Sequence, residues 1–283
     1  MKLLVFGKTG QVARELQRQC HCVALGRGAA DLRNPESCAR AIQAHRPDAV
    51  INAAAFTAVD QAEAAAAEAD VVNGDAPAAM ARAAVGRGIP FLHISTDYVF
   101  DGTGNTPRKP NELPAPVNAY GRSKLLGETG VAAAGGSYAI LRTSWVFSAH
   151  GGNFVKTMRQ LGNERSALSV VDAQVGGPTP AADIAAALLT MAAALRQDRG
   201  KSGIYHYCGT PAVSWAAFAK EVFKQTGQQV EVTGIPSAAY PTPAERPLNS
   251  RLDCTSLAEV FGIVQPDWRR GLQQVLAELE AAK

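Results

Sequence analysis

Short apolar runs alternate with helix-like patterns along the first half of the 283-residue chain. The apolar runs predict strands over residues 3–7, 22–26, 49–54, 91–96 and 138–145. Apolar positions at helical spacing predict helices near 11–19, 35–45, 59–87 and 118–134, the alanine-rich 59–87 being a helix pair. Strands that are apolar throughout and alternate with helices are typical of a parallel sheet covered on both faces.

Beyond about residue 148 this rhythm loosens, with helices predicted near 180–197 and 214–226 and a Pro-rich stretch at 234–247. We therefore predict an α/β fold, a Rossmann-type doubly wound parallel sheet with a smaller C-terminal substrate-binding lobe. Residues 1–147 would form the dinucleotide-binding domain, with the helix near 180–197 packing back on it. Residues 148–283 would form mainly the second lobe.

A glycine turn, "GKTGQVA" at residues 7–13, joins the first strand to the first helix. Gly7 allows a tight turn, Gly10 lets a pyrophosphate approach the backbone, and the small Ala13 permits close helix–strand packing. The helix that begins near Gln11 would point its free N–H groups at the phosphates. The turn indicates a dinucleotide site, and a plain strand–helix turn is the alternative.

The end of the second predicted strand indicates which dinucleotide would bind. Gly26 stands where an acidic residue would bind the ribose 2′-hydroxyl, and Arg27 follows it. A guanidinium there could pair with a 2′-phosphate, which favours NADPH over NADH. A solvated loop arginine is the alternative for Arg27. Asp31 could meet the adenine amine or cap a turn.

Thr96, Tyr120 and Lys124 form a coherent catalytic set. Thr96 ends the fourth predicted strand, while "YGRSK" places Tyr120 and Lys124 one helical turn apart. A hydride that moves from nicotinamide to a ketone leaves negative charge on the oxygen, which needs a proton. We expect Tyr120 to supply it, with Lys124 lowering the pKa of the phenol and Thr96 bonding the carbonyl oxygen.

These motifs resemble the extended short-chain dehydrogenase/reductases. More narrowly, "FGKTGQV", "NAAAFTAVDQAE", "LRTSWVF", "NFVKTM", "GGPTPAADIA" and "YPTPAERPLNSRLD" resemble the dTDP-4-dehydrorhamnose reductase family nearly from end to end. The resemblance implies reduction of the 4-keto group of dTDP-4-dehydro-L-rhamnose to dTDP-L-rhamnose by NADPH or NADH. This is the last step of dTDP-rhamnose biosynthesis, which feeds O-antigen synthesis.

The resemblance also implies residue roles. Gly10, Gln11 and Val12 would cradle the pyrophosphate, and Asp31, Leu32, Ala55, Phe56 and Thr57 would line the cofactor. Tyr120 would be the proton donor and Lys124 its partner, Thr96 and Asp97 would touch the sugar, and Trp145 would lie against the substrate or be a core indole. Some relatives hold Mg²⁺ through carboxylates at a homodimer interface; Glu15 matches one ligand, and the others are not identifiable here.

A nucleotide diphosphate needs cationic partners in the second lobe. Arg246 and Arg251, in "ERPLNSRLD", are candidates because planar guanidinium matches phosphate oxygens. Loop anchoring is the alternative for both. His93, His150 and His206 lack any pattern that indicates a metal, so we expect them to be structural and predict no metal ligands.

Composition excludes some classes of function. The net charge is only +3 and no Lys/Arg run occurs, so neither nucleic acid nor membrane is an expected partner. Five cysteines without metal or redox spacing are expected to be reduced, in a cytoplasmic protein. Two rivals stay open: a reductase or epimerase of another nucleotide sugar, and a non-catalytic NADP-binding regulatory subunit like that of methionine adenosyltransferase.

Overall fold

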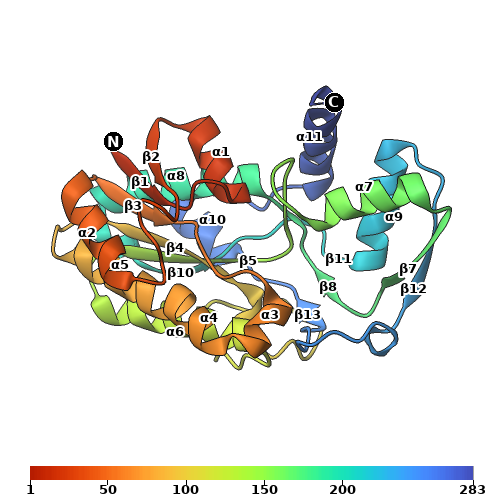
Figure 1. Cartoon of the computed structure of the whole chain (residues 1–283), viewed down its shortest axis with the longest axis horizontal. Coiled ribbons are helices and arrows are strands. Elements are labelled where there is room, and N and C mark those ends of the chain that lie inside the picture. The colour runs from red at the N-terminus through yellow and green to blue at the C-terminus, as the bar shows by residue number, and fades with distance from the viewer. Residues whose placement is uncertain (283) are drawn as a thin grey trace.

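The computed structural model describes residues 1–282 as a parallel sheet with helices and a second group of elements beside it (Figure 1). In the first half the elements are β1 (Leu3–Phe6), α1 (Gln11–Gln19), β2 (Cys22–Leu25), α2 (Pro35–His45), β3 (Ala49–Asn52), α3 (Val59–Ala64), α4 (Ala66–Asp70), α5 (Ala76–Val85), β4 (Phe91–Thr96), α6 (Ala119–Ala134) and β5 (Tyr138–Thr143). The second half adds β6 (Val146–Phe147), α7 (Phe154–Glu164), β7 (Ala167–Val171), β8 (Val175–Gly176), β9 (Thr179–Pro180), α8 (Ala181–Gln197), β10 (Gly203–His206), β11 (Val213–Ser214), α9 (Trp215–Thr226), β12 (Glu231–Ile235), β13 (Asn249–Ser250), α10 (Thr255–Phe261) and α11 (Trp268–Ala281).

The main sheet has the strand order β10-β5-β4-β3-β1-β2, and every neighbouring pair is parallel. The strand order reverses at β1, which pairs with both β2 and β3. In open parallel sheets such a reversal leaves a crevice at the carboxyl ends of the strands, where ligands bind. The predicted fold class is confirmed.

Alternate residues of β1 enter two different apolar layers. Leu3 and Val5 pack with residues of α1 and α8, while Leu4 and Phe6 pack with residues of α2 and α5. This follows from the two-residue period of a strand when both faces are covered. Figure 1 shows α1 and α8 on one side of the sheet and α2, α5 and α6 on the other.

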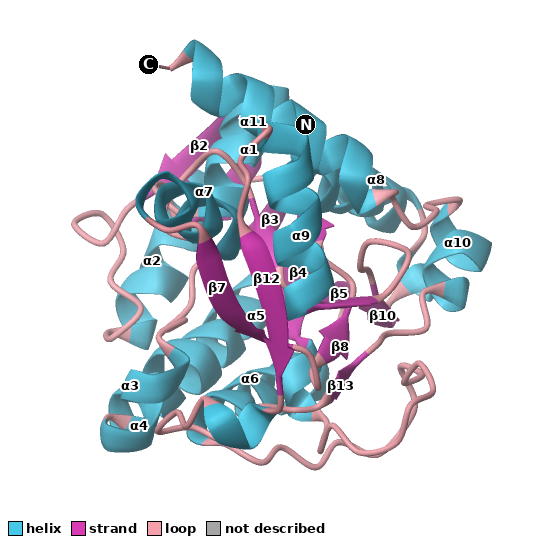
Figure 2. Cartoon of the chain, turned by 90° about the vertical axis from the view of Figure 1, so that its right-hand side faces the viewer, coloured by secondary structure: helices cyan, strands magenta, loops and turns pink. Residues whose placement is uncertain are grey.

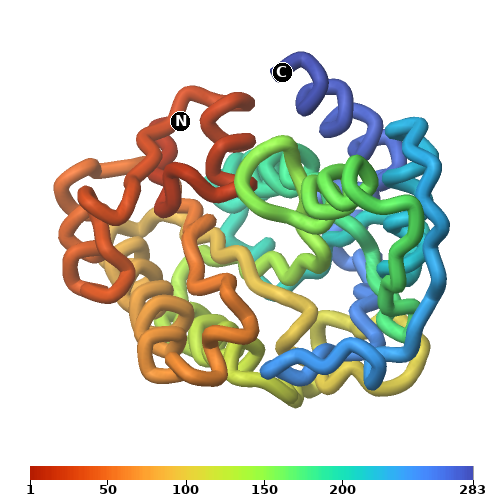
Figure 3. The backbone as a smooth tube through the Cα atoms, turned by 45° about the vertical axis from the view of Figure 1, so that its right-hand side comes forward, coloured from red at the N-terminus to blue at the C-terminus, as the bar shows by residue number. Residues whose placement is uncertain are grey.

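A second apolar core lies beside the sheet, and its largest side chains include Phe218 of α9 and Trp268 of α11. In it β7 pairs in parallel with β12, and α9 lies against this pair (Figure 2). Three short strands, β11, β8 and β13, form a further small sheet. The chain ends in α11, which lies beside the N-terminal elements in Figure 3.

Two segments of the second half belong to the first core, which the sequence pattern did not predict. Strand β10 adds the edge strand next to β5, and Tyr205 within it is buried. Leu257 of α10 packs in the same apolar cluster. The chain therefore crosses back to the sheet after building part of the second core.

The predicted helix pair over 59–87 is broken into α3, α4, a π-helical turn over Val71–Asp75, and α5. The π-helical turn directs Asn73 to the backbone of Phe56, where its side chain accepts from N–H at 2.8 Å and donates to C=O at 3.0 Å. Asn73 also donates to Ser123 of α6. The interruption is thus used to hold a loop at the edge of the sheet, as is common for π-turns at functional sites.

A buried ion pair anchors α6 to the sheet. Arg142 of β5 donates to both oxygens of Glu128, at 2.9 Å from Nε and 2.6 Å from Nη2. Ser95 of β4 donates to the same carboxylate at 2.5 Å. Both charged side chains are at most 2% exposed, so neither has water as an alternative partner.

We predict that Arg142→Met destabilises the protein by about 3–5 kcal/mol, because it leaves the Glu128 carboxylate buried without its counter-charge. Urea unfolding gives the change in free energy. The exposed pair Arg40–Glu36 is the matched control, and Arg40→Met is expected to cost less than about 1 kcal/mol. Equal losses in the two variants would show that α6 does not depend on this pair.

Candidate active site

A cavity of about 810 Å³ opens at the carboxyl ends of the strands. Every residue predicted to bind the cofactor lines it: Gly7, Gly10, Gln11, Val12, Arg27, Asp31, Leu32, Ala55, Phe56, Thr57, Tyr120 and Lys124. Thr96, Asp97 and Trp145 line it as well, whereas Arg246 does not. The pattern did not single out Lys8, Arg33 and Trp215, which also line the cavity.

The glycine turn is shaped by two close approaches of backbone. Gly7 has φ +98°, and a Cβ there would lie 3.2 Å from the carbonyl oxygen of Ala53. Gly10 is the N-cap of α1 and has no side chain to bond the first N–H groups of the helix. These N–H groups therefore face the cavity without a capping partner. Such an end attracts phosphate.

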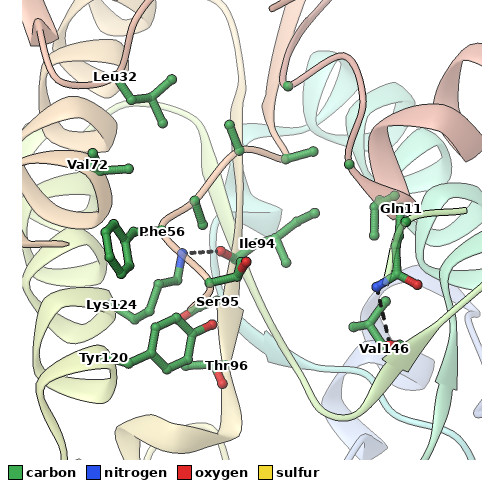
Figure 4. A pocket seen from close by; sticks show the side chains of 18 of the residues that line it. Gln11, Leu32, Phe56, Val72, Ile94, Ser95, Thr96, Tyr120, Lys124 and Val146 are labelled. Carbon is green, nitrogen blue, oxygen red and sulfur yellow. Dashed lines mark hydrogen bonds between the residues drawn. The ribbon is translucent and has the colours of Figure 1, made fainter. Parts of the chain in front are cut away.

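Gln11 holds β6 and the loop that leads to α7 beside this turn. Its Oε1 accepts from Ser148 at 2.9 Å and from Asn153 at 3.0 Å, and its Nε2 donates to Val146 C=O at 3.4 Å (Figure 4). A residue expected only to cradle a pyrophosphate thus also joins the two walls of the cavity.

Three basic side chains lie at the end of the cavity next to β2. Lys8, Arg27 and Arg33 are all exposed there, and no acidic side chain stands at Gly26. Arg33 pairs with Asp31 at 2.7 Å and lowers the pKa of Asp31 to about 2. Asp31 is therefore already engaged by a guanidinium, while Arg27 has no ion-pair partner within residues 1–282.

Asn118 starts α6 and thereby sets the positions of Tyr120 and Lys124. Its side chain accepts from the N–H of Gly121 at 2.8 Å, which begins the helix so that Tyr120 is in the first turn. A Cβ on Gly121 would lie 2.1 Å from the carbonyl oxygen of Tyr98, so only glycine permits this contact. The glycine in "YGRSK" is thus what lets Tyr120 reach the end of β4.

Thr96 lies at the end of β4 and caps the short 3-10 turn Asp97–Val99. Its hydroxyl donates to Asp97 at 3.0 Å and also acts on Tyr120 to lower the pKa of the phenol. Tyr98 packs edge-on against Tyr120, with 5.7 Å between the ring centroids. Thr96, Tyr120 and Lys124 therefore meet at one edge of the sheet, as Figure 4 shows.

The structure does not bear out a lowered pKa for Tyr120. The ring borders the cavity but is closely surrounded by protein, and burial raises its pKa above the usual value. Lys124 does not offset this, because its Nζ donates to Ile94 C=O at 2.7 Å and lies 3.2 Å from His93 Nε2. Burial also lowers the pKa of Lys124 to about 8. Desolvation, which disfavours any charged form, dominates both groups.

His93 and His206 have more specific surroundings than the sequence indicated. His93 was expected to be structural, but it contacts Lys124 directly. His206 lies 3.4 Å from Arg142 Nη1 and 2.9 Å from Arg108 C=O, outside the cavity. Nothing in the local sequence pairs His93 with a lysine 31 positions later.

Asp97 is a buried carboxyl with one unsatisfied oxygen. It is 3% exposed, and its Oδ2 has no hydrogen-bond partner within the described chain. Burial raises its pKa to about 6, although the nearby Ser250 and the hydrogen bond from Thr96 act in the opposite direction. The free oxygen is available to a polar group that enters the cavity.

Trp145 lies at a bend that ends β5 two residues earlier than predicted. It has φ +48°, which is uncommon for a residue with a side chain. This conformation stacks its ring on that of Trp215, with centroids 3.6 Å apart and planes 10° apart. The two indoles form an aromatic wall of the cavity, and sequence reasoning missed Trp215 because it comes 70 residues later.

Arg246 lies next to the cavity but is engaged elsewhere. Its guanidinium pairs with Asp60 at 2.8 Å and reaches the hydroxyl of Tyr98 at 3.5 Å. The N–H of Ala244 also donates to Asp60. Arg251 donates to Asn249 of β13. The contacts with Asp60 anchor the Pro-rich segment to α3, and a phosphate-binding role for either arginine stays a prediction.

A cluster around Glu15 tests the Mg²⁺ that the resemblance implied. Ligand atoms of Glu15, His150 and Glu278 lie within 4.8 Å of one another. However, Arg18 bonds Glu15 at 2.8 Å and Glu278 at 2.5 Å, so a guanidinium already supplies the positive charge. Mg²⁺ also prefers oxygen ligands to imidazole. The cluster does not fit Mg²⁺.

The fold and the cavity define a dinucleotide-dependent oxidoreductase of the Rossmann type, because a glycine turn and a Thr–Tyr–Lys set face each other across one crevice. Residues 1–281 match the family described as the RmlD substrate binding domain. The chain belongs to this family, which confirms the resemblance to the dTDP-4-dehydrorhamnose reductases.

Named relatives agree with this membership. A dTDP-4-dehydrorhamnose reductase of Sinorhizobium fredii is 44% identical, covering 98% of this chain and 97% of the relative. The solved structure of such a reductase from Clostridium acetobutylicum is 35% identical with a TM-score of 0.92, covering 99% of this chain and 100% of that one. One from Bacillus anthracis, solved in complex with NADP, is 34% identical with a TM-score of 0.91, covering 98% and 100%.

Within residues 1–282, helices long and apolar enough to cross a membrane are absent.

Asp97 generates a prediction about stability and pH. Its pKa in the folded protein is above the value of about 4 for an unfolded chain, so the folded state binds more protons between pH 4 and pH 6. Stability should therefore fall as pH rises through this window. Relative to Asp97→Asn, the wild-type protein is expected to lose about 2 kcal/mol of unfolding free energy between pH 4 and pH 7, measured by urea unfolding at both values.

Asp101→Asn is the control, because Asp101 should change the unfolding free energy with pH in the opposite direction. Hydrogen bonds from Thr103 and the charge of Arg108 lower the pKa of Asp101, so this carboxylate contributes stability that is lost on acidification. The gap between wild type and Asp101→Asn should grow as pH rises. A pH-independent gap for Asp97→Asn would mean that this carboxyl is not desolvated in solution.

Proposed function

We propose that this protein reduces the 4-keto group of dTDP-4-dehydro-L-rhamnose to give dTDP-L-rhamnose, with NADPH as the preferred reductant and NADH as the alternative. The observation that carries the proposal is the single cavity that joins the glycine turn to Thr96, Tyr120 and Lys124. The names of the relatives and the NADP bound to the Bacillus anthracis protein support the substrate and the cofactor.

Tyr120 acts as the general acid in this mechanism. When bound, the reduced nicotinamide supplies the hydride. The Tyr120 hydroxyl then donates its proton to the carbonyl oxygen of the substrate, while Thr96, by turning its O–H away from Asp97, donates a hydrogen bond to the same oxygen. Because burial keeps the phenol protonated, Tyr120 is in the form that reduction requires. Lys124, when charged, stabilises the phenolate that remains.

The two units would divide the work of binding. Residues 1–147 would hold the dinucleotide and contribute Trp145 to the aromatic wall against the nucleotide sugar, and residues from 148 onward would contribute Trp215. Trp145 and Trp215 offer stacked faces on which a flat or apolar face of the ligand can lie. The free oxygen of Asp97 would accept a hydrogen bond from a sugar hydroxyl.

Arg246 would bind the pyrophosphate only by leaving Asp60. The ion pair at 2.8 Å is partly exposed, with 21% of the arginine and 39% of the aspartate side chain accessible. Exposed pairs are worth only about 0–1 kcal/mol, so a diphosphate, which carries one negative charge on each phosphate, can displace the carboxylate. This exchange would move the Pro-rich segment when the nucleotide binds.

We predict that Tyr120→Phe lowers kcat for reduction of dTDP-4-dehydro-L-rhamnose by about 10²–10⁴-fold, because only the hydroxyl that delivers the proton is removed. The assay follows the loss of nicotinamide absorbance with purified protein. NADPH affinity should change little, since the ring still fills its place against Tyr98.

Tyr138→Phe is a matched control, because that hydroxyl lies outside the cavity. Full activity of Tyr120→Phe would refute Tyr120 as the acid. Wild-type protein that binds NADPH but leaves this sugar unreduced would refute the substrate, and a panel of other keto sugar nucleotides would then be assayed.

Arg27 carries a separate prediction about cofactor choice. Arg27→Ala should raise KM for NADPH by about tenfold or more, because a charge-assisted bond to the 2′-phosphate is lost. KM for NADH should stay nearly constant, since NADH lacks that phosphate. Arg40→Ala, at an exposed arginine of α2 outside the cavity, is the control. An equal rise for both cofactors would assign Arg27 a general role in the loop.

A further inference from the structure

A chain of buried hydrogen bonds connects Lys124 to β3 and β4. Lys124 Nζ lies 3.2 Å from His93 Nε2, and His93 Nδ1 lies 3.1 Å from Asn52 Nδ2. Asn52 Oδ1 in turn accepts from the N–H of Ala54 at 3.2 Å. All three side chains are at most 2% exposed, so water does not compete for these contacts. This series of hydrogen bonds therefore runs from the backbone of Ala54, which lines the cavity, to the amine of Lys124.

The direction of these bonds follows from their donors and acceptors. The oxygen of Asn52 is occupied by the N–H of Ala54, so its amide nitrogen faces His93, and an amide nitrogen can only donate. Nδ1 of His93 must therefore accept. Burial and the nearby Lys124 lower the pKa of His93 well below its usual value, which keeps the ring neutral. The single ring proton is then on Nε2, where it points at Lys124.

This arrangement treats the two charge states of Lys124 differently. Its Nζ donates to Ile94 C=O at 2.7 Å in either state. A neutral amine also has a lone pair, which accepts from the Nε2–H of His93. An ammonium group has none, so an N–H would face an N–H at 3.2 Å. His93 thus holds the neutral amine in place and opposes its protonation.

Other groups around Lys124 set the balance. Glu128, one turn further along α6, favours the ammonium form, although Arg142 of β5 neutralises much of its charge. Tyr120 lies one turn earlier on the same helix, and Asp97 beyond β4 acts on Tyr120. β3 and the π-helical turn present only the uncharged amides Asn52 and Asn73. His93 is the titratable group in direct contact with the amine.

We propose that His93 is a positioning residue for the reduction: its ring, oriented by Asn52, fixes the place of the Lys124 amine and sets how readily that amine takes up a proton. The inference rests on the proposed function, in which Lys124 supports proton donation by Tyr120. It also links the backbone at Ala54, which lines the cavity, to the charge of the catalytic lysine.

Two substitutions of His93 separate position from charge. His93→Asn keeps an amide near the place of Nδ1, and so the contact with Asn52, but does not reach Lys124. His93→Gln reaches the place of Nε2 and can turn an amide oxygen toward the amine. For each variant and the wild type, two quantities are measured as a function of pH. One is kcat with NADPH and the keto sugar, and the other is the Kd of NADPH in the absence of sugar, from nicotinamide fluorescence.

For the wild type, both profiles should bend near pH 8, where the pKa of Lys124 lies. In His93→Asn the bend should move up by about one pH unit, because the opposing N–H is gone, and kcat should fall about tenfold, because the amine loses its fixed place. His93→Gln should recover most of kcat while the bend stays shifted, since its oxygen accepts from the ammonium form.

Leu92→Ala is the matched control for stability. Leu92 precedes His93 on β4 and packs into the opposite apolar layer, away from Lys124. It should lower the melting temperature without moving either bend. Two results would overturn the proposal and leave His93 a packing residue. In the first, the His93 variants have lower melting temperatures but pH profiles that bend where the wild-type profiles do. In the second, His93→Asn and His93→Gln have the same loss of kcat.

The NADPH measurement separates this inference from the proposed function. A wild type that does not reduce the keto sugar refutes the substrate, yet the shift in the Kd profile still supports or overturns the role of His93. If neither His93 variant folds, Asn52→Asp decides. Its carboxylate would accept a hydrogen bond from Nδ1–H and so draw the ring proton away from Nε2. The bend in the pH profiles should then move to higher pH, and a bend at the wild-type pH would overturn the proposal.

Discussion

The close approach of α6 to the edge of the sheet is the constraint on which the site depends. A Cβ at Gly121 would lie 2.1 Å from Tyr98 C=O, and one at Gly127 would lie 2.0 Å from Asn73 C=O. A side chain at either position would push the helix outward by more than backbone can absorb. Only at this depth can Glu128 meet Arg142, so the small residues and the buried ion pair enforce one position of the helix.

The same depth explains the electrostatics of the site. Burial raises the pKa of Tyr120 and Asp97 and lowers that of Lys124, so all three groups favour their neutral forms. A protonated phenol is what reduction of a ketone requires, so desolvation suits the donor. Burial also makes the pKa of Lys124 sensitive to its neighbours, because water no longer stabilises the ammonium form. The neighbours of Lys124 therefore matter more than its place in a motif.

Local features of the fold and the site could be predicted from the sequence, and features made by distant contacts could not. Strands with continuous apolar runs and the glycine turn are written in adjacent residues, and the spacing of Tyr120 and Lys124 is one helical turn. By contrast, β10 has only four residues and belongs to the sheet because of its parallel pairing with β5. The π-helical turn exists because Asn73 reaches Phe56, a contact that no local period encodes.

The chemistry of the site shows the same division. The sequence places Tyr120 and Lys124 together and suggests that the ammonium lowers the pKa of the phenol. Where the ammonium points depends on Ile94 and His93, whose strand meets α6 only in the folded protein. Arg246 likewise matches a phosphate partner by type, but its neighbour Asp60 comes from α3. Residue type and spacing define what a group can do, and its buried neighbours decide which form it takes.

Hydrogen bonds join the glycine turn to the loop that follows the aromatic wall. Gln11 begins α1 at the glycine turn, and its side chain accepts from Ser148 and Asn153 in that loop. At the other end of the same helix, Arg18 bonds Glu278 of α11. Helix α1 is thus bonded near its start to the loop after β6 and near its end to α11. A phosphate bound at the start of α1 would therefore lie on a helix whose first side chain is hydrogen-bonded to the loop that follows the aromatic wall.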